Sequence, residues 1–331
     1  MKLAITGHGR LSNRSFPLLV WILLSGLYLV SPSVLRAAQN TGLFVRTPVK
    51  LDKPAAIRVN SDLVQIPVTV LDRYNHPVLG IEKKHFKVFE DRVEQSITHF
   101  AMEDAPISIG FVFDASASMR DKVEKSREAV TTFLNTANPS DEFFLVQFHD
   151  QVELAVDLTT SAREVQNQLS LIEPAGRTAL LDAIYFSVQH MHIANNARKV
   201  LIIISDGGDN SSRYTMTDLK KLMSEEDVQI YAMGIFDPRS QTPDELAGPS
   251  LLRGLAKQSG GRLFGIDSTN QLPDIAFNIG EALRTMYVLG YSPKEMLHKG
   301  KYHRLEVKPA QPKDSPKLQA SWRRGYYAPV E

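Results

Sequence analysis

The stretch that decides the fold is ISIGFVF at residues 107–113, followed at once by DASAS at residues 114–118. Seven residues rich in branched and aromatic side chains, bounded by small polar ones, predict a buried β-strand. A second run, VLIII at residues 200–204, has the same character and leads into SDG at residues 205–207. Strands that lack polar alternation are covered on both faces, as in a sheet between two layers of helices. Both runs therefore predict central strands of an α/β domain.

Strands and helices alternate outward from these two runs across the whole interval 105–284. Periodicity predicts further strands at residues 143–148, 152–156, 229–235 and 262–266, and helices at 119–134, 162–172, 179–191, 217–225, 250–258 and 272–284. The first two of these strands are separated by only three residues, so they form a hairpin at an antiparallel edge. This alternation predicts a doubly wound, mostly parallel six-stranded sheet with helices on both faces.

Both flanks of this domain carry β patterns of a different kind. Short, alternating strands are predicted at residues 64–70, 86–89, 93–100, 286–291, 302–308 and 318–327. The strands before the α/β domain are too few to close a core alone. We therefore expect residues 58–104 and 285–331 to pair into one small β-sandwich, with the α/β domain of residues 105–284 inserted between them.

Composition excludes several classes of protein. The chain has 331 residues, of which 43% are hydrophobic, and its 38 basic side chains are balanced by 37 acidic ones. These values exclude a disordered polar tail and a strongly charged nucleic-acid binder, so no nucleic acid is expected as a partner. Cysteine is absent, which excludes disulfides, thiolate metal sites and Cys nucleophiles. No Gly-x-x-x-x-Gly-Lys-Ser/Thr loop is present, and no small-molecule cofactor is expected.

The first 38 residues have the character of an export segment. Three basic residues within the first 14 positions precede an apolar run at residues 16–30. That run is shorter than the ~20 residues of a spanning helix. Residues 1–38 are thus expected to be either a cleaved signal peptide or a signal anchor, and residues 39–57 a linker. We expect an exported protein of the periplasm, the cell envelope or the medium, which touches a membrane only through an uncleaved anchor.

Polar side chains follow the two central strands at their carboxyl ends. Asp114, Ser116 and Ser118 follow the first strand, and Asp206 follows the second. In doubly wound sheets, ligands bind beyond the carboxyl ends of strands, where the strand order reverses. If the two strands are neighbours, these side chains converge, because alternate residues of an extended turn share a face. Hydroxyl and carboxylate oxygens suit Mg²⁺, with Mn²⁺ also possible, so the sequence predicts a divalent-metal site.

Together with Thr178, which begins a predicted helix, these motifs resemble the metal-ion-dependent adhesion site (MIDAS) of the von Willebrand factor type A (VWA) family, which includes integrin I domains. The chain resembles bacterial exported proteins with a VWFA-related domain more closely than it resembles integrin I domains. Those chains close with segments like YVLGYSP at residues 287–293 and RGYYAP at residues 324–329. The resemblance covers nearly everything after residue 60 and implies the same doubly wound fold.

The resemblance also implies roles for the five motif residues. Ser116, Ser118 and Thr178 would contact the metal directly or nearly so, whereas Asp114 and Asp206 would hold it largely through hydrogen-bonded water. Hydroxyl ligands leave the cation under-neutralised, so an external carboxylate is the natural last ligand. In this family an Asp or Glu of a bound protein completes the coordination.

Further polar residues are expected at the rim of this site. Asp182, in the first turn of the helix that Thr178 precedes, either supports the ligands or caps a neighbouring loop, and Asp209 is expected to cap the next turn. Arg177 replaces a glycine that is frequent in the family. With Arg120 and Arg213 it is expected to orient an acidic partner.

Two other groups of residues are interpreted as structural. His190 and His192 lie two apart on a helix and point to different faces, so they are expected to be partly exposed surface groups and not ligands. Trp322, Tyr326 and Tyr327 are expected to pack within strands, with stacking on carbohydrate or peptide as the alternative. Neither group adds to the predicted metal site.

Three functions are compatible with these residues. The first is a non-catalytic, metal-dependent protein-binding module of the bacterial cell envelope. The second is a hydrolase in which the metal polarises a phosphoryl or ester group. The sequence contains no Asp-x-Asp nucleophile, no Gly-x-Ser-x-Gly elbow and no His-Glu-x-x-His helix, which disfavours this function. The third is an assembly factor whose ion only holds loops together. The sequence favours the first.

Overall fold

The central sheet has six strands in the order β10-β9-β8-β5-β6-β7. Its strands are β5 (Ile107–Asp114), β6 (Glu142–Phe148), β7 (Val152–Thr159), β8 (Arg198–Ser205), β9 (Val228–Gly234) and β10 (Arg262–Gly265). All neighbours run parallel except β6 and β7, which form an antiparallel edge. The predicted doubly wound, mostly parallel sheet is therefore confirmed, and the two apolar runs, β5 and β8, are neighbours at its centre.

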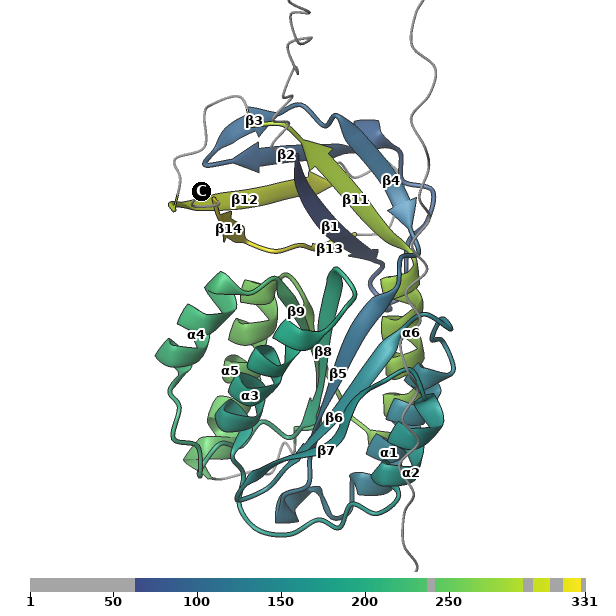
Figure 1. Ribbon diagram of the computed structural model, residues 1–331, viewed down its shortest axis with the longest axis vertical. Coiled ribbons are helices and arrows are strands. Elements are labelled where there is room, and N and C mark those ends of the chain that lie inside the picture. The colour runs from purple at the N-terminus through teal and green to yellow at the C-terminus, as the bar shows by residue number, and fades with distance from the viewer. Residues whose placement is uncertain (1–62, 237–241, 294–299, 310–317, 329–331) are drawn as a thin grey trace, which may run out of the picture. The chain divides into compact units, whose positions relative to one another are not determined.

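The computed structural model describes residues 63–236, 242–293, 300–309 and 318–328 (Figure 1). These ranges all belong to one unit, Val59–Glu331. The expected export segment, residues 1–38, and the expected linker, residues 39–57, lie outside the described residues. Within the described ranges, no helix combines the length and the hydropathy that a membrane span requires.

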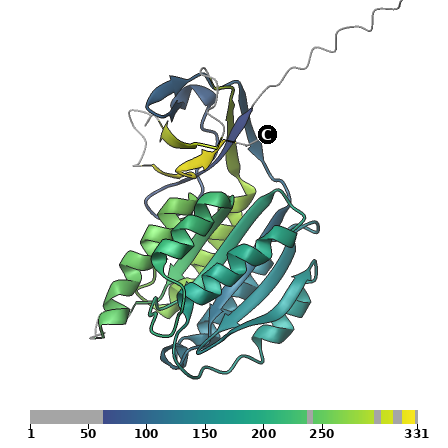
Figure 2. The same ribbon diagram turned by 60° about the vertical axis from the view of Figure 1, so that its left-hand side comes forward.

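Helices cover both faces of the central sheet (Figures 1 and 2). They are α1 (Val123–Leu134), α2 (Ala162–Leu169), α3 (Leu180–His190), α4 (Met216–Glu225), α5 (Pro243–Ser259) and α6 (Leu272–Arg284), with short 3₁₀ turns η1 (Lys83–His85), η2 (Ala117–Met119), η3 (Met191–Ile193) and η4 (Thr269–Gln271). Alternate residues of β8 face the two layers. Ile202 packs with α1, α2 and α6, whereas Ile203 packs with α3, α4 and α5.

The boundaries of two helices differ from the prediction. Helix α5 begins at Pro243, well before the expected start at residue 250, because Thr242 caps it and Pro243 suits the first helical position. Pro249 lies inside α5 and interrupts the helical pattern of the sequence. Helix α1 begins at Val123, and Met119 belongs to the separate turn η2 that leads into it.

The flanking strands form two four-stranded sheets, in the orders β13-β1-β11-β4 and β14-β12-β2-β3. The strands are β1 (Val64–Leu71), β2 (Phe86–Glu90), β3 (Val93–Gln95), β4 (His99–Glu103), β11 (Met286–Tyr291), β12 (Tyr302–Pro309), β13 (Gln319–Ser321) and β14 (Gly325–Tyr327). Each sheet therefore combines strands from before and after the α/β domain. Their inner faces share one core, in which Ile66 and Val88 pack with Tyr287 and Leu305. The expected β-sandwich of paired termini is present.

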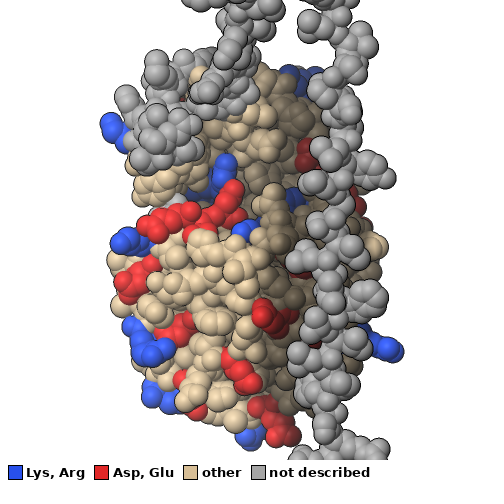
Figure 3. Space-filling model, viewed as in Figure 1, with Lys and Arg blue, Asp and Glu red and all other residues tan. Residues whose placement is uncertain are grey.

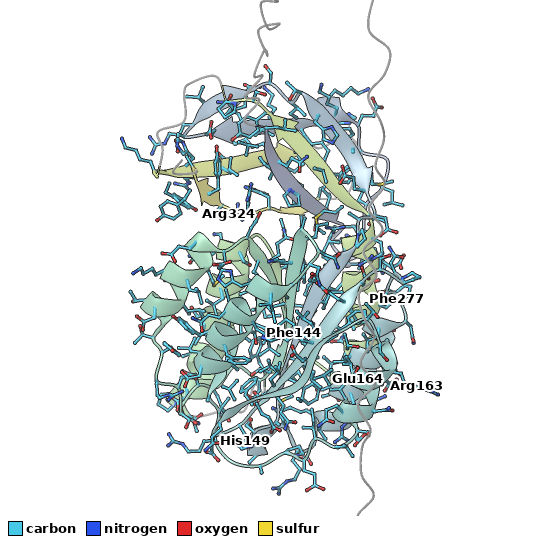
Figure 4. The ribbon with its side chains drawn as sticks, in the orientation of Figure 1. Phe144, His149, Arg163, Glu164, Phe277 and Arg324 are labelled. Carbon is cyan, nitrogen blue, oxygen red and sulfur yellow. The ribbon has the colours of Figure 1, made fainter. Side chains whose placement is uncertain are left out.

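Ion pairs and hydrogen bonds join the sandwich to the central sheet near the two connections between them. Arg284 lies 3.1 Å from both Asp104 and Asp141, and Asp141 is fully buried. Arg198 donates to the carbonyl oxygen of Ala105 at 3.2 Å and to that of Leu283 at 2.7 Å. These contacts lie at the amino ends of the strands, so the carboxyl ends remain accessible. Figure 4 labels Arg324 near the sandwich strands and His149 at the other end of the sheet.

Charged side chains of both signs are interspersed on the face that Figure 3 shows. This distribution agrees with the balanced composition of 38 basic and 37 acidic residues.

Candidate metal centre

Asp114 is the innermost group at the carboxyl edge of the sheet. It ends β5, and its side chain is fully buried. One carboxylate oxygen accepts the backbone N–H of Ser116 at 2.9 Å, and the other accepts the hydroxyl of Ser205 at 2.6 Å. Ser205 ends the neighbouring strand β8. Asp114 therefore ties together the two loops that carry the predicted site residues.

The two serines of the first loop lie side by side. The hydroxyl oxygens of Ser116 and Ser118 are 3.0 Å apart, and the turn η2 between α1 and β5 sets this spacing. Ser116 is buried, whereas Ser118 is exposed. The loop is fixed to the segment before α3, because the N–H of Ala117 donates to the carbonyl oxygen of Gly176 at 3.2 Å.

Thr178 lies just before α3 and is held by the loop that follows β8. Its N–H donates to the side-chain oxygen of Asn210 at 3.0 Å, and its carbonyl oxygen accepts the N–H of Asn210 at 3.0 Å. The turn before it needs a glycine. Gly176 has φ +71°, and a Cβ there would lie 2.2 Å from a carboxylate oxygen of Asp150. Thr178 is 4% exposed.

Asp206 is the second carboxylate of the site. It is 5% exposed, and one of its oxygens accepts a hydrogen bond from the ammonium of Lys122 at 2.9 Å. The following residue, Gly207, has φ +84°, and a Cβ there would lie 2.8 Å from the Cα of Gly248. Only glycine fits this turn, which brings the loop after β8 close to α5.

The electrostatics of the site favour a bound cation. Burial, and then the charge of Asp206, raise the pKa of Asp114 from 3.8 to about 7, although hydrogen bonds from Ser116 and Ser205 lower it. A buried carboxylate next to a second carboxylate is costly to ionise, and hydrogen bonds or nearby positive charge favour its ionised form. Carboxylate and hydroxyl oxygens, the side-chain donors of these loops, are the ligands that hard divalent cations prefer.

Residues 108–278, more than half of the chain, match the sequence profile of the von Willebrand factor type A domain. The chain belongs to this family. The family, and the fold that the resemblance implied, are thus as predicted.

Similar curated proteins include inter-alpha-trypsin inhibitor heavy chains. Heavy chain H2 of Sus scrofa is 24% identical over 208 residues, which cover 55% of this chain and 22% of that protein. Heavy chain H4 of Sus scrofa is 30% identical over 131 residues, which cover 36% of this chain and 14% of that protein. The chain thus spans about a fifth or less of the length of these relatives.

Similar solved structures are VWA proteins. A von Willebrand factor type A protein from Catenulispora acidiphila is 14% identical with a TM-score of 0.49, covering 82% of this chain and 75% of that one. Proximal thread matrix protein 1 of the mussel byssus, described with zinc in its MIDAS motif, is 19% identical with a TM-score of 0.46. It covers 59% of this chain and 49% of that one.

The acidic rim residues of the VWA domain hold loops together. Asp182 accepts the N–H groups of Arg213 and Tyr214 at 2.8 and 2.9 Å, which are the contacts of a loop cap. Asp209 accepts the hydroxyl of Ser212 at 2.5 Å, but it also accepts the N–H of Leu181 at 3.4 Å. It therefore caps α3 across the site as well as its own turn.

The basic rim residues differ in the contacts that their side chains make. The guanidinium of Arg177 donates to the carbonyl oxygen of Asn210, and that of Arg213 lies 3.2 Å from Asp182 while the side chain stays 87% exposed. Arg120 is exposed beyond η2. All three extend from the loops at the carboxyl edge of the VWA sheet, where they were expected.

The residues interpreted as structural have identified contacts. His190 and His192 pair with Asp157 and Glu226 at 3.0 and 2.8 Å; the side chain of His190 is only 12% exposed, more buried than expected. The aromatic residues near the carboxyl terminus behave as strand residues. Trp322 and Tyr326 pack against the sandwich core, and the rings of Tyr327 and Tyr302 meet edge to face.

Sequence reasoning missed three residues of the site: Ser205, Asn210 and Lys122. From the sequence, Ser205 could be recognised only as the last residue of a strand. Asn210 accepts the N–H of Thr178, which lies 32 residues away in the chain. Lys122 lies 84 residues from its partner Asp206. Within the described ranges, no cluster of three or more His, Cys, Asp or Glu side chains could hold a metal ion. A metal in this VWA domain would therefore depend on hydroxyl ligands.

Proposed function

We propose that this chain is a non-catalytic, Mg²⁺-dependent protein-binding module of the bacterial cell envelope. The observation that carries the proposal is the buried Asp114 next to Asp206, with a pKa of about 7 and hydroxyl groups converging on it from separate loops. A bound cation would favour the ionised form of this arrangement. Mn²⁺ is a possible substitute.

The five motif residues would have two different roles at the metal. Ser116, Ser118 and Thr178 would hold the metal through neutral hydroxyls, and Asp114 and Asp206 would hold it largely through water. When bound, the metal supplies a Lewis-acidic centre that accepts a carboxylate from outside. Because Ser118 is exposed while Asp114 is fully buried, the site is accessible from the side of the serines. The ligand that fits is an Asp or Glu side chain of a partner protein.

The location rests on the amino-terminal sequence. The basic residues and apolar run of residues 1–38 support export, to the periplasm, the envelope or the medium. Asp114 and Ser116 are engaged with each other and with β8, and no imidazole belongs to the five motif residues. This arrangement supports binding of a ligand rather than catalysis on it.

The first test is calorimetric titration of Mg²⁺ into the full chain. Ser118→Ala removes an exposed hydroxyl whose hydrogen bond within the described residues is to Ser116. We expect it to weaken Mg²⁺ binding at least about tenfold while the fold is retained, because one ligand is lost. Ser161→Ala, which removes a hydroxyl that caps α2 away from the site, is the matched control and should bind as the wild type does. Equal affinities of Ser118→Ala and the wild type would contradict the assignment.

The second test distinguishes the three functions. The wild-type chain is used to capture proteins from envelope extract with Mg²⁺ or with a chelator. Capture that requires Mg²⁺ and is lost in Ser118→Ala supports the binding module. Partner retention after chelation would indicate an ion that only holds loops together. Mg²⁺-dependent release of phosphate from a generic ester would indicate the hydrolase.

A further inference from the structure

Lys122 places a positive charge inside the candidate site. It lies between η2 and α1, and its side chain is only 19% exposed. Its ammonium is 2.9 Å from a carboxylate oxygen of Asp206, whose side chain is 6% exposed. This partly buried ion pair joins the loop after β5 to the loop after β8. It is therefore part of the site itself and not a surface pair.

The charge balance of the site follows from this contact. Counted over these three groups alone, Asp114 and Asp206 contribute two negative charges when both are ionised and Lys122 contributes one positive charge, which leaves −1. The neighbouring guanidinium groups of Arg177 and Arg213 are directed at the carbonyl oxygen of Asn210 and at Asp182. A divalent cation would therefore give these three groups and the ion a net charge of +1, one unit more positive than the two carboxylates and the ion without Lys122.

We propose that the ammonium of Lys122 lowers the affinity of the site for metal. With the metal bound, the same ammonium makes the site more positive toward an acidic partner. This inference rests on the proposed function. The ammonium and a metal share the same carboxylate of Asp206, and like charges repel strongly where water is excluded. The same repulsion makes the bound metal less neutralised and hence more attractive to an external carboxylate. Lys122 thus weakens the binding of the metal and strengthens the binding of the partner's carboxylate.

A purely structural role of Lys122 predicts the opposite result. Its backbone already holds the start of α1, because its N–H donates to Met119 and its carbonyl oxygen accepts the N–H of Ser126 at 3.0 Å. Those contacts persist when the side chain changes. If the ammonium served only to hold Asp206 in place, its loss would weaken metal binding and partner binding together. If it competes with the metal, the two affinities move in opposite directions.

The experiment titrates Mg²⁺ into the full chain carrying Lys122→Met, which keeps the length of the side chain and removes its charge. We expect Mg²⁺ to bind about tenfold more tightly than in the wild type. Lys122→Arg retains the charge and should stay within about twofold of the wild type. Lys125→Met is the matched control, because Lys125 pairs with Glu128 on the exposed side of α1 and should leave the affinity unchanged. Lys122→Gln replaces Lys122→Met if the latter does not fold.

The partner half is tested with acetate as the probe for a carboxylate side chain. Acetate is titrated into the Mg²⁺-saturated proteins and followed by backbone amide shifts of residues 115–119. We expect acetate to bind several-fold more weakly to Lys122→Met than to the wild type. Equal or weaker Mg²⁺ binding by Lys122→Met, or unchanged acetate binding, overturns the role of Lys122 alone. Absence of Mg²⁺ and Mn²⁺ binding by the wild type defeats the proposed function, and this inference with it.

Discussion

At the scale of single residues, Asp114 couples metal binding to pH. Its folded-state pKa of about 7 lies above the ordinary value of 3.8 because of burial and the charge of Asp206. Without metal, the ionised form is disfavoured in the folded protein. The corresponding stability is therefore present below pH 4 and is lost as the pH rises from about 4 to about 7. A bound cation reverses this, since it favours the ionised carboxylate.

The pKa of Asp114 predicts proton release on metal binding. Below pH 7 the metal must displace a proton, so Mg²⁺ affinity should fall about tenfold for each unit of pH below 7 and level off above it. Calorimetry at pH 6 and pH 8, in buffers of different ionisation enthalpy, measures both the affinity and the proton count.

Asp114→Asn is the control for this pH dependence. Its amide does not ionise, so the metal-free protein should keep its stability between pH 4 and pH 8, and Mg²⁺ should no longer raise the melting temperature. Wild-type Mg²⁺ affinity that is the same at pH 6 and pH 8 would show that Asp114 does not exchange a proton for the metal.

At the scale of elements, a strand or helix boundary could be predicted from the sequence where the contacts that determine it are local in the chain. The buried strands β5 and β8 were evident because every position is apolar over most of their length. The start of α5 was missed because Pro249 breaks a pattern that the structure nevertheless continues. The capping of α3 by Asp209 was missed because its contact with Leu181 crosses 28 residues, a separation that no local pattern encodes.

The candidate site shows the same division. The five motif residues could be proposed from the sequence because each follows a recognisable strand or precedes a helix, and a doubly wound topology brings such positions to one edge of the sheet. The residues that position them, such as Asn210 and Lys122, act through side chains across loops. Their roles depend on the loop conformations, which glycines such as Gly176 and Gly207 determine.

The connection between α6 and the sandwich gives a prediction at the element scale. Arg284 pairs with Asp141, which is fully buried and also accepts the N–H of Ile107 at 2.8 Å. Arg284→Met leaves this carboxylate without its charged partner. We expect the free energy of unfolding to fall by about 3 kcal/mol, as for other buried pairs with one partner removed. Denaturant titration measures it.

Arg163 offers the control for this substitution. It lies on α2 with an exposed side chain (Figure 4), so Arg163→Met should change the free energy of unfolding by less than about 0.5 kcal/mol. If Arg284→Met proves as stable as Arg163→Met, the ion pair does not hold the connection.

At the scale of the whole molecule, the sandwich and the site lie at opposite ends of the central strands. The connections to the sandwich meet at Arg284 and Arg198, by the amino ends of β5 and β8, whereas Asp114 and Ser205 end these strands. The chain enters the α/β domain from one sandwich strand, β4, and returns directly into another, β11, which pairs with it. The sandwich therefore depends on both flanks of the chain, and the site depends on neither.

This arrangement predicts the result of ending the chain after residue 284. Strand β1 then loses both of its neighbours, β11 and β13, and β2 loses β12. The core residues Tyr287, Leu289, Leu305 and Val307 disappear with them. Only the pair β2 and β3 remains, and an isolated two-stranded hairpin is marginally stable at best. Residues 63–103 should therefore become rapidly cleaved in limited proteolysis read by mass spectrometry.

The metal site should behave differently in the same truncated chain. The contacts of Asp114, Ser116, Thr178 and Asp206 all involve residues between β5 and α4, which the truncation leaves in place. We expect Mg²⁺ affinity within about threefold of the full chain, because the truncation removes none of these contacts. A chain ending after residue 309 keeps β11 and β12 and should protect residues 63–103 more than the shorter chain does. Protection of that segment in the chain ending at residue 284 would mean that the sandwich does not need its carboxyl-terminal strands.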